Sequence, residues 1–306
     1  MIRPLVFALV LALSATGASA DRYSDCNQSA DPDRRIRGCT QVIERGEGES
    51  RENRSFAYTN RGNAYDDKGE FDRAIADYTK AIALDPNYAF AYNNRGLTYE
   101  KKGEIDRAIA DSTKAIALDP NYAIAYNNRG NAYSRKGEHD RAIADYTKAI
   151  ALNPKSAFAY NNRGITYKNK GEVDRAIADY DKAIAIDPNY AIAYNNRGLA
   201  YKKKGEFDRA IADYDAAIAL DPKLAQAYYN RGLAYGRKGA FDRAIADNDK
   251  AIALNPNYAT AYYNRGLAYE QKGDKEQAIA DFRKALEIDP SDQYAKNNLK
   301  RLGVTP

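Results

Sequence analysis

The sequence of residues 55–88, SFAYTNRGNAYDDKGEFDRAIADYTKAIALDPNY, decides the fold. In its first half, Tyr58, Gly62 and Tyr65 fall at i, i+4 and i+7, so they share one face of a predicted helix. Gly69 ends that pattern, because glycine most easily adopts the positive φ with which many helices stop. The first half therefore predicts one helix together with its stop signal.

The second half of the same stretch repeats this logic. Ala74, Tyr78 and Ala81 are again spaced as i, i+4 and i+7, and they predict a second helix. Pro86 ends it, because proline lacks the backbone N–H that a helix needs. Small residues at Gly62, Ala74 and Ala81 let two helix backbones approach closely. The stretch is therefore predicted to form a hairpin of two closely packed helices.

The pattern recurs every 34 residues along the chain. Seven repeats run from Ser55 to Asp292, and they take up 238 of the 306 residues. Two columns of glycine hold 14 of the 20 glycines, and one column of proline holds seven of the 10 prolines. A period sustained over this length excludes a single closed core and predicts a stacked array, in which each repeat packs mainly on its neighbours.

These repeats resemble the tetratricopeptide repeat. The family pattern of Trp, Leu-Gly, Tyr, Ala, Phe and Pro is matched in the first repeat by Tyr58, Arg61-Gly62, Tyr65, Ala74, Tyr78 and Pro86. Strings such as Ala-Tyr-Asn-Asn-Arg-Gly are similar to those of exported bacterial members. The resemblance implies an all-α fold, a right-handed superhelical solenoid of antiparallel helix pairs whose first helices line a concave groove.

Arginine stands where the family pattern has leucine, at a position that is normally packed. Each arginine is followed 16 residues later, across the hairpin, by an aspartate. We expect the planar guanidinium to pair with the carboxylate at a half-buried helix contact; the alternative is that both charges are solvated. The pairs are Arg61–Asp77, Arg95–Asp111, Arg129–Asp145, Arg163–Asp179, Arg197–Asp213, Arg231–Asp247 and Arg265–Asp281.

Both ends of the chain depart from the repeat. Residues 33–40 parallel residues 72–79, which indicates a degenerate eighth repeat with Cys39 in the column of Tyr78, followed by a polar linker over Gly46–Arg54. Ser291–Leu302 is predicted to form one more helix, which closes the open end of the array. The chain is thus divided into a signal peptide (1–20), a degenerate disulfide-stapled N-terminal helix pair with its linker (21–54), seven repeats (55–292) and a C-terminal capping helix (293–306).

Residues 1–20 have the order of a secretory signal peptide. Arg3 supplies the positive start, Leu5–Leu13 is an apolar run, and Ala18-Ser19-Ala20 is a small-residue cleavage site. The run is shorter than the roughly 20 residues that a transmembrane helix needs, which disfavours the alternative of an uncleaved membrane anchor. We expect a periplasmic or secreted protein without a stable membrane anchor.

Few residues are available for catalysis or metal binding. Cys26 and Cys39 are the two cysteines, and in an exported chain they are expected to form a disulfide. His139 is the single histidine and stands in a column filled mostly by large apolar side chains, so we interpret it as a packing residue. The sequence therefore predicts no enzyme, no cofactor and no metal site.

One polar column suggests a binding function. Every repeat has an asparagine two positions before its first glycine, although asparagine costs up to ~0.7 kcal/mol of helix propensity relative to alanine. Its amide can donate to and accept from the backbone of an extended peptide, and the resemblance implies such a ladder. The alternative is a hydrogen bond to the neighbouring repeat. The predicted peptide-binding residues are Asn60, Asn94, Asn128, Asn162, Asn196, Asn230 and Asn264.

Apolar columns and the charge balance indicate which ligands the protein binds. Hydrophobic ligand side chains are favoured by the predicted groove residues Phe56, Phe90, Ile124, Phe158 and Ile192, and Leu97, Ile165, Leu199, Leu233 and Leu267. The 47 basic and 42 acidic residues give a formal charge of +5, which does not predict a nucleic-acid surface. We expect a non-catalytic scaffold of the bacterial cell envelope that binds protein or peptide segments. The alternative is a self-assembling or structural factor of the envelope.

Overall fold

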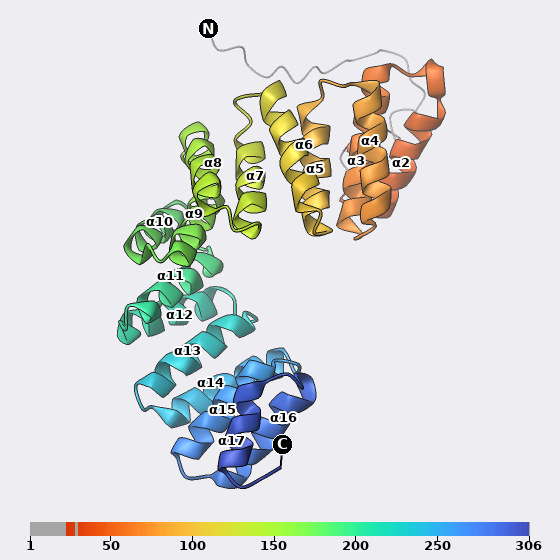
Figure 1. The fold of residues 1–306 in the computed structure, drawn as a ribbon. Helices are drawn as coiled ribbons and strands as arrows, with labels where there is room; N and C mark the ends of the chain where they lie inside the picture. Colours follow the sequence, from red (N-terminus) through yellow and green to blue (C-terminus); the bar gives the residue numbers. More distant parts are fainter. Residues whose placement is uncertain (1–22, 28–29, 306) are drawn as a thin grey trace. The chain divides into compact units, whose positions relative to one another are not determined.

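All regular structure in the described part of the protein is helical. The computed structural model describes residues 23–27 and 30–305, whose helices follow one another in packed pairs (Figure 1). The predicted all-α fold of stacked helix pairs is confirmed. The predicted signal peptide, residues 1–20, lies outside the described residues.

The chain separates into two compact units, Met1–Leu152 and Asn153–Pro306. Below, the odd-numbered helix of each 34-residue repeat is called the first helix and the even-numbered one the second helix. The N-terminal unit contains α2 (Pro32–Glu44), the 3₁₀ helix η1 (Gly46–Gly48), α3 (Arg51–Asp67), α4 (Phe71–Leu84), α5 (Ala89–Lys101), α6 (Ile105–Leu118), α7 (Ala123–Arg135) and α8 (His139–Leu152). The C-terminal unit contains α9 (Ala157–Lys170), α10 (Val173–Ile186), α11 (Ala191–Lys203), α12 (Phe207–Leu220), α13 (Ala225–Arg237), α14 (Phe241–Leu254), α15 (Ala259–Gln271), α16 (Lys275–Ile288) and α17 (Gln293–Arg301).

The two glycine columns have different physical roles. Gly130 of α7 faces the ring of Tyr146 in α8, and a Cβ atom on Gly130 would lie 2.7 Å from Tyr146 Cε1. Tyr146 is 2% exposed, so the ring has no free space into which it could move. Gly69 instead has a φ of 75° with no atom near the place of a Cβ, and it serves the turn between the helices.

The first helices form one continuous face in each unit. Every second helix packs on the first helix of its own repeat and, within a unit, on the first helix of the next. Successive first helices also contact one another directly: α3, α5 and α7 in the N-terminal unit, and α9, α11, α13 and α15 in the C-terminal unit. The second helices therefore form the layer behind this face.

The seven predicted arginine–aspartate pairs are all present as half-buried ion pairs. In α7 and α8, Arg129 Nε and Nη2 donate to the two carboxylate oxygens of Asp145 at 2.7 and 2.8 Å. The seven aspartates are 4–7% exposed, so the alternative of solvated charges is wrong. The hydrogen bond from Arg129 to Asp145 raises the pKa of the guanidinium, which keeps it charged despite partial burial.

The guanidinium also reaches the preceding repeat. Arg129 Nη1 donates to Thr113 Oγ1 in α6 at 3.1 Å, and Arg197 Nη1 donates to Asp181 in α10 at 2.6 Å. Each of these arginines therefore links two repeats as well as two helices. This explains how a charged side chain can occupy a position that the family pattern gives to leucine.

The N-terminal segment packs on the first complete repeat. Residues 23–27 are helical, and Cys26 and Cys39 are buried together with Val42 of α2 and Ala57 of α3. The sulfurs of the two cysteines lie 2.06 Å apart, at bonding distance. Formation of this disulfide in the exported protein stays a prediction, which a chemical measurement must test.

The predicted polar linker Gly46–Arg54 is too long. Gly46–Gly48 form η1, and Ser50 caps α3 because its hydroxyl accepts a hydrogen bond from the Asn53 backbone N–H at 3.0 Å. The helix consequently begins at Arg51, and the last four residues of the predicted linker are its first turn.

Helix α17 covers the end of the last repeat. Leu299 and Ala295 are fully buried, and they pack on Phe282 of α16. Asp292 caps the helix by accepting hydrogen bonds from two backbone N–H groups. The helix therefore begins at residue 293, where the capping helix is predicted.

Candidate binding surface

A row of exposed apolar side chains lies on the first helices. It consists of one residue in the first half of each of α3, α5, α7, α9 and α11, and its members are 41–63% exposed although they are large. We call these residues the apolar row: Phe56, Phe90 and Ile124 in the N-terminal unit, and Phe158 and Ile192 in the C-terminal unit.

Tyrosines at the N-cap positions of the first helices support this row. The ring of Phe90 stacks on those of Tyr88 and Tyr122, with centroids 6.2 and 6.4 Å apart. The ring of Phe158 contacts Tyr190 edge to face at 5.1 Å. Burial raises the pKa of Tyr88 to about 12, so these phenols stay neutral at physiological pH. The apolar row thus has aromatic neighbours that hold its rings in place.

The second predicted apolar column is less accessible. Leu97, Ile165, Leu199, Leu233 and Leu267 are all half-buried. Leu199, for example, packs against the core formed by Tyr201, Ala210 and Tyr214. This column therefore serves mainly the packing between helices, whereas the apolar row remains exposed to solvent.

The asparagine column makes hydrogen bonds between repeats. Asn128 Nδ2 donates to Asn93 Oδ1 at 3.0 Å, across 35 residues of sequence. Asn196 makes the same contact with Asn161, and Asn230 makes it with Asn195, both at 2.9 Å. Asn128, Asn196 and Asn230 are at most 8% exposed.

These contacts join into a chain of amides in the N-terminal unit. Asn93 Nδ2 donates to Asn94 Oδ1 at 3.1 Å, and Asn94 Nδ2 donates to Asn63 Oδ1 at 2.8 Å. The hydroxyl of Tyr78 also donates to Asn63 Oδ1, at 2.8 Å. A continuous line of polar groups therefore fixes the spacing of α3, α5 and α7.

The first and last members of the column each donate to a backbone carbonyl. Asn60 Nδ2 donates to the backbone carbonyl of Cys26 at 3.2 Å, and Asn264 Nδ2 donates to the Thr260 carbonyl of its own helix at 2.7 Å. Asn60, Asn94, Asn162 and Asn264 are half-buried. The alternative of a bond between neighbouring repeats therefore describes the buried members and Asn94, and binding of a peptide by the column stays a prediction.

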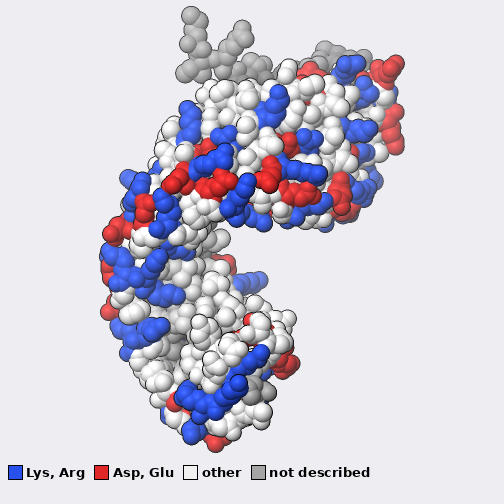
Figure 2. All heavy atoms as spheres, viewed as in Figure 1, with Lys and Arg blue, Asp and Glu red and all other residues white. Residues whose placement is uncertain are grey.

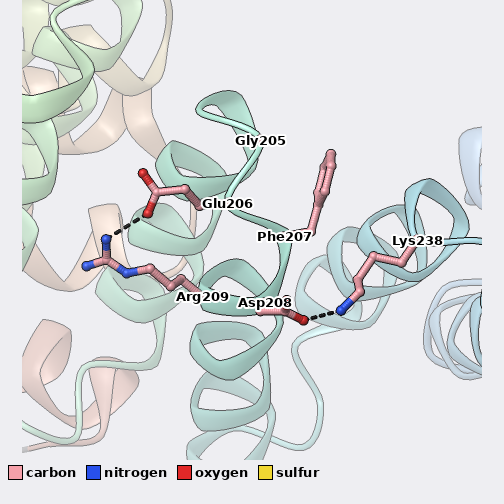
Figure 3. Close-up of a pocket in the computed structure, with 6 residues that line it drawn as sticks. All are labelled: Gly205, Glu206, Phe207, Asp208, Arg209 and Lys238. Atoms are coloured by element: carbon pink, nitrogen blue, oxygen red, sulfur yellow. Dashed lines mark hydrogen bonds and ion pairs between the residues drawn. The ribbon is translucent and has the colours of Figure 1, made fainter.

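The pocket drawn in Figure 3 lies at the turn between α11 and α12, beside the end of α13. It is lined by Phe207 and by two ion pairs, Glu206 with Arg209 at 2.7 Å and Asp208 with Lys238. Equivalent pairs recur in other repeats. Its charges are thus paired and its geometry is shared along the array, so we assign the pocket no catalytic role.

Other candidates for chemistry belong to the packing. His139 is half-buried at the start of α8, as expected for a packing residue. Within residues 23–27 and 30–305, no cluster of three or more His, Cys, Asp or Glu side chains is arranged to hold a metal ion. None of the helices in this described part combines the length and the apolarity that crossing a bilayer requires.

Stacked helix pairs that present one face of first helices define an α-helical repeat scaffold. Family models described as "TPR repeat" match residues 62–103, 101–137, 166–205, 200–239 and 237–273, and models described as "Tetratricopeptide repeat" match residues 123–156, 145–178 and 259–292. The chain belongs to the tetratricopeptide repeat family.

Solved structures agree with this assignment. The APC/C hetero-tetramer Cut9–Hcn1 gives a TM-score of 0.69 at 22% identity over 89% of this chain and 52% of that chain. A tetratricopeptide repeat protein from Parabacteroides merdae gives 0.63 at 24% identity over 80% and 97%. YrrB, described as a TPR protein with an unusual peptide-binding site, gives 0.50 at 28% identity over 62% and 97%.

These likenesses differ in what they show. The chain spans about half the length of the first of these structures, 52%, and the first two likenesses show the fold alone. No curated protein sequence matches the chain.

Proposed function

We propose that the protein is a non-catalytic scaffold of the bacterial cell envelope that binds extended segments of partner proteins along its first helices. The apolar row carries the proposal, because five large side chains are 41–63% exposed at one position of successive repeats. Contiguous exposed apolar side chains are typical of interaction surfaces. The peptide-binding site named for YrrB supports the same function.

The spacing of the row favours an extended ligand. Helices in direct contact lie roughly 8–10 Å apart, and an extended chain advances about 3.3 Å per residue. Every third residue of a bound segment would therefore meet the next member of the row. A segment with large apolar side chains at that spacing fits the row within each unit.

The asparagine column belongs to the proposed surface in two ways. The buried amides of Asn128, Asn196 and Asn230 hold the first helices at a fixed distance. The half-buried members keep accessible surface with which they can bond a peptide backbone. Each such bond adds only about 0.5–1.5 kcal/mol, so several are needed for measurable affinity.

Binding of uncharged peptides tests the proposal. The probes are synthetic peptides with leucine or phenylalanine at every third position, and matched peptides with serine there. We expect the apolar peptides to bind, and Phe90→Ser with Ile124→Ser to weaken binding about tenfold or more, because each large contact contributes about 1.5–3 kcal/mol.

The chain offers a matched control for this measurement. Leu220 and Leu254 are 38% and 40% exposed, but they lie on the second helices α12 and α14. Leu220→Ser with Leu254→Ser should leave peptide affinity unchanged. Equal losses in both variants, or equal binding of the serine peptides, would contradict the proposal. Association of the protein without peptide, seen by light scattering and removed by the Phe90 and Ile124 changes, would favour the self-assembling alternative.

The envelope location rests on the signal pattern of residues 1–20. If it is right, the protein recovered from the envelope fraction begins at Asp21. Its intact mass should also be lower by two hydrogens than that of the reduced chain, because we expect Cys26 and Cys39, whose sulfurs lie at bonding distance, to form a disulfide. A chain that keeps Met1, or that has two free thiols, would contradict this part of the proposal.

A further inference from the structure

Ion pairs join the ends of successive first helices in the N-terminal unit. Asp66 at the end of α3 pairs with Lys101 at the end of α5. Glu100 of α5 pairs with Arg135 of α7, whose Nη1 lies 3.4 Å from Glu100 Oε1 and also donates to the Glu100 backbone carbonyl at 2.5 Å. At this position an acid on one helix therefore meets a base on the next.

At the same position, two first helices of the C-terminal unit carry a base instead of an acid, whereas Glu270 of α15 keeps the acid and pairs with Arg301 of α17. Lys168 of α9 and Lys202 of α11 stand where α3 and α5 have acids. Lys203 Nζ lies 3.4 Å from the backbone carbonyl of Lys168, which is the main-chain contact that Arg135 makes with Glu100. The register of the two helices is thus the same, while the sign of one charge is reversed.

We call Lys168, Lys202, Lys203 and Arg237 the basic cluster. No ion pair joins any of the four to a carboxylate in the described part of the chain. Burial lowers the pKa of Lys168 and that of Lys202, and repulsion from the neighbouring cations lowers both further. Four like charges on three adjacent helices are therefore gathered without a carboxylate partner among the described residues, and an anionic ligand would reduce the repulsion between them.

Stabilisation of helix ends accounts for the basic cluster only in part, although all four cations lie in the last turn of their helices. A cation near a helix C-terminus is favourable because of the helix dipole, but Lys204 and Lys238 already occupy the C-cap positions of α11 and α13. In the N-terminal unit, acidic and basic side chains lie close together on the visible face in Figure 2. The basic cluster is thus a local departure from the pairing that the repeats otherwise use.

We propose that the basic cluster binds an acidic, extended segment of a protein partner, an inference that rests on the proposed scaffold function and specifies one of its ligands. Its members come from three consecutive first helices. Neighbouring helices lie roughly 8–10 Å apart, so the outer two are about 16–20 Å apart, which is further than one carboxylate or phosphate can bridge. A chain with an acidic side chain at about every third residue reaches all three helices. Its carboxylates would take the place of Glu100 in each pair.

Two peptides that differ only in charge test this inference. The first has glutamate at every third position of a glycine–serine background, and the second has glutamine there. We expect the glutamate peptide to bind the full mature chain at least about tenfold more tightly at low salt, and the difference to shrink as salt is added. Equal binding of both peptides would overturn the inference.

The N-terminal unit supplies the design of the decisive variant. Lys168→Glu with Lys202→Glu places acids opposite Lys203 and Arg237, as Glu100 lies opposite Arg135. Its melting temperature should therefore be retained or raised, while the glutamate peptide loses at least about tenfold in affinity. The matched control is Lys182→Glu with Lys250→Glu, the same charge change on exposed positions of α10 and α14, which should keep most of the affinity. An equal loss in the control, or none in the decisive variant, would overturn the inference.

Two further arms separate this inference from its alternatives. The first arm compares inorganic phosphate with chloride at equal ionic strength, and we expect phosphate to displace the glutamate peptide only weakly. If phosphate displaced it at concentrations similar to those of a competing peptide, the basic cluster would be a site for a free anion, and the inference would be overturned. The uncharged apolar peptides should bind the Lys168 and Lys202 variant normally. If they bind no form of the protein while the glutamate peptide binds, the apolar row has failed and the basic cluster stands.

Discussion

At the residue scale, the contact between glycine and tyrosine is the tightest constraint in the repeat. A Cβ on Gly62, Gly130, Gly164 or Gly198 would lie 2.6–2.7 Å from a tyrosine ring carbon. In the second repeat the tyrosine is replaced by Ser112, and the nearest atoms to a Cβ on Gly96 lie at 3.2 Å. The same glycine column therefore has one position at which a methyl group nearly fits.

This difference gives a prediction with an internal control. Gly130→Ala should lower the melting temperature, because forcing a methyl group against a buried ring costs about 1–3 kcal/mol. Gly96→Ala should be neutral or slightly stabilising, since alanine gains about 1 kcal/mol over glycine inside a helix. Thermal unfolding followed by circular dichroism measures both. Equal effects at the two positions would contradict the assigned packing.

The asparagine column gives a second prediction at this scale. Asn128→Ala leaves the buried Oδ1 of Asn93 without its donor, so it should destabilise the protein by about 1–3 kcal/mol. Asn264→Ala removes a bond within one helix at a half-buried site and should cost less. Denaturant unfolding of the two variants measures the difference. If Asn128→Ala weakened peptide binding and left stability unchanged, the column would serve the ligand rather than the spacing of helices.

Residue-level contacts could be predicted where two columns lie within one hairpin. Arg129 and Asp145 are 16 residues apart across a turn, so their pairing follows from the hairpin itself. The asparagine contact spans 35 residues and depends on how one repeat stacks on the next. The sequence did contain a signal for this contact, the consecutive asparagines 93 and 94. The partner of Asn128 is Asn93, the residue just before the column member Asn94.

At the element scale, the helix-terminating residues predicted the helices well. Glycine ends the first helix of each pair and proline ends the second, and both residues recur in all seven repeats. The linker Gly46–Arg54 was predicted too long because its polar residues show no apolar period, whereas Ser50 is a capping residue that starts a helix regardless. The basic cluster was missed for another reason: lysines at a helix end are usually solvated, and nothing in one repeat shows which charge faces it from the next.

Helix α17 gives a prediction at this scale. Leu299 is fully buried against Phe282, so Leu299→Asp should detach the helix and expose the apolar end of the last repeat. We expect a lower melting temperature and aggregation, measured by light scattering during heating. Tyr294 on the same helix is 74% exposed, and Tyr294→Ala should leave both unchanged. A soluble Leu299→Asp protein with normal melting would show that α17 is not needed as a cap.

At the scale of the whole molecule, the 34-residue period predicted the architecture but not its division. The period runs through Leu152 and Asn153 unchanged, although these residues separate the two compact units. The formal charge of +5 likewise gave no indication of the basic cluster, because a net charge does not show where charges of one sign are concentrated. Both features depend on contacts between repeats, which a column pattern describes only in part.

We expect ligands to lie along the first helices, and site-specific photo-crosslinking tests this mode of binding most directly. A photoreactive phenylalanine analogue replaces Ile124, in the apolar row, or Lys114, which is exposed on the second helix α6. Each variant is irradiated with the uncharged apolar peptide. We expect a peptide adduct from position 124 and none from position 114. Adducts from position 114, or equal yields from both positions, would contradict it.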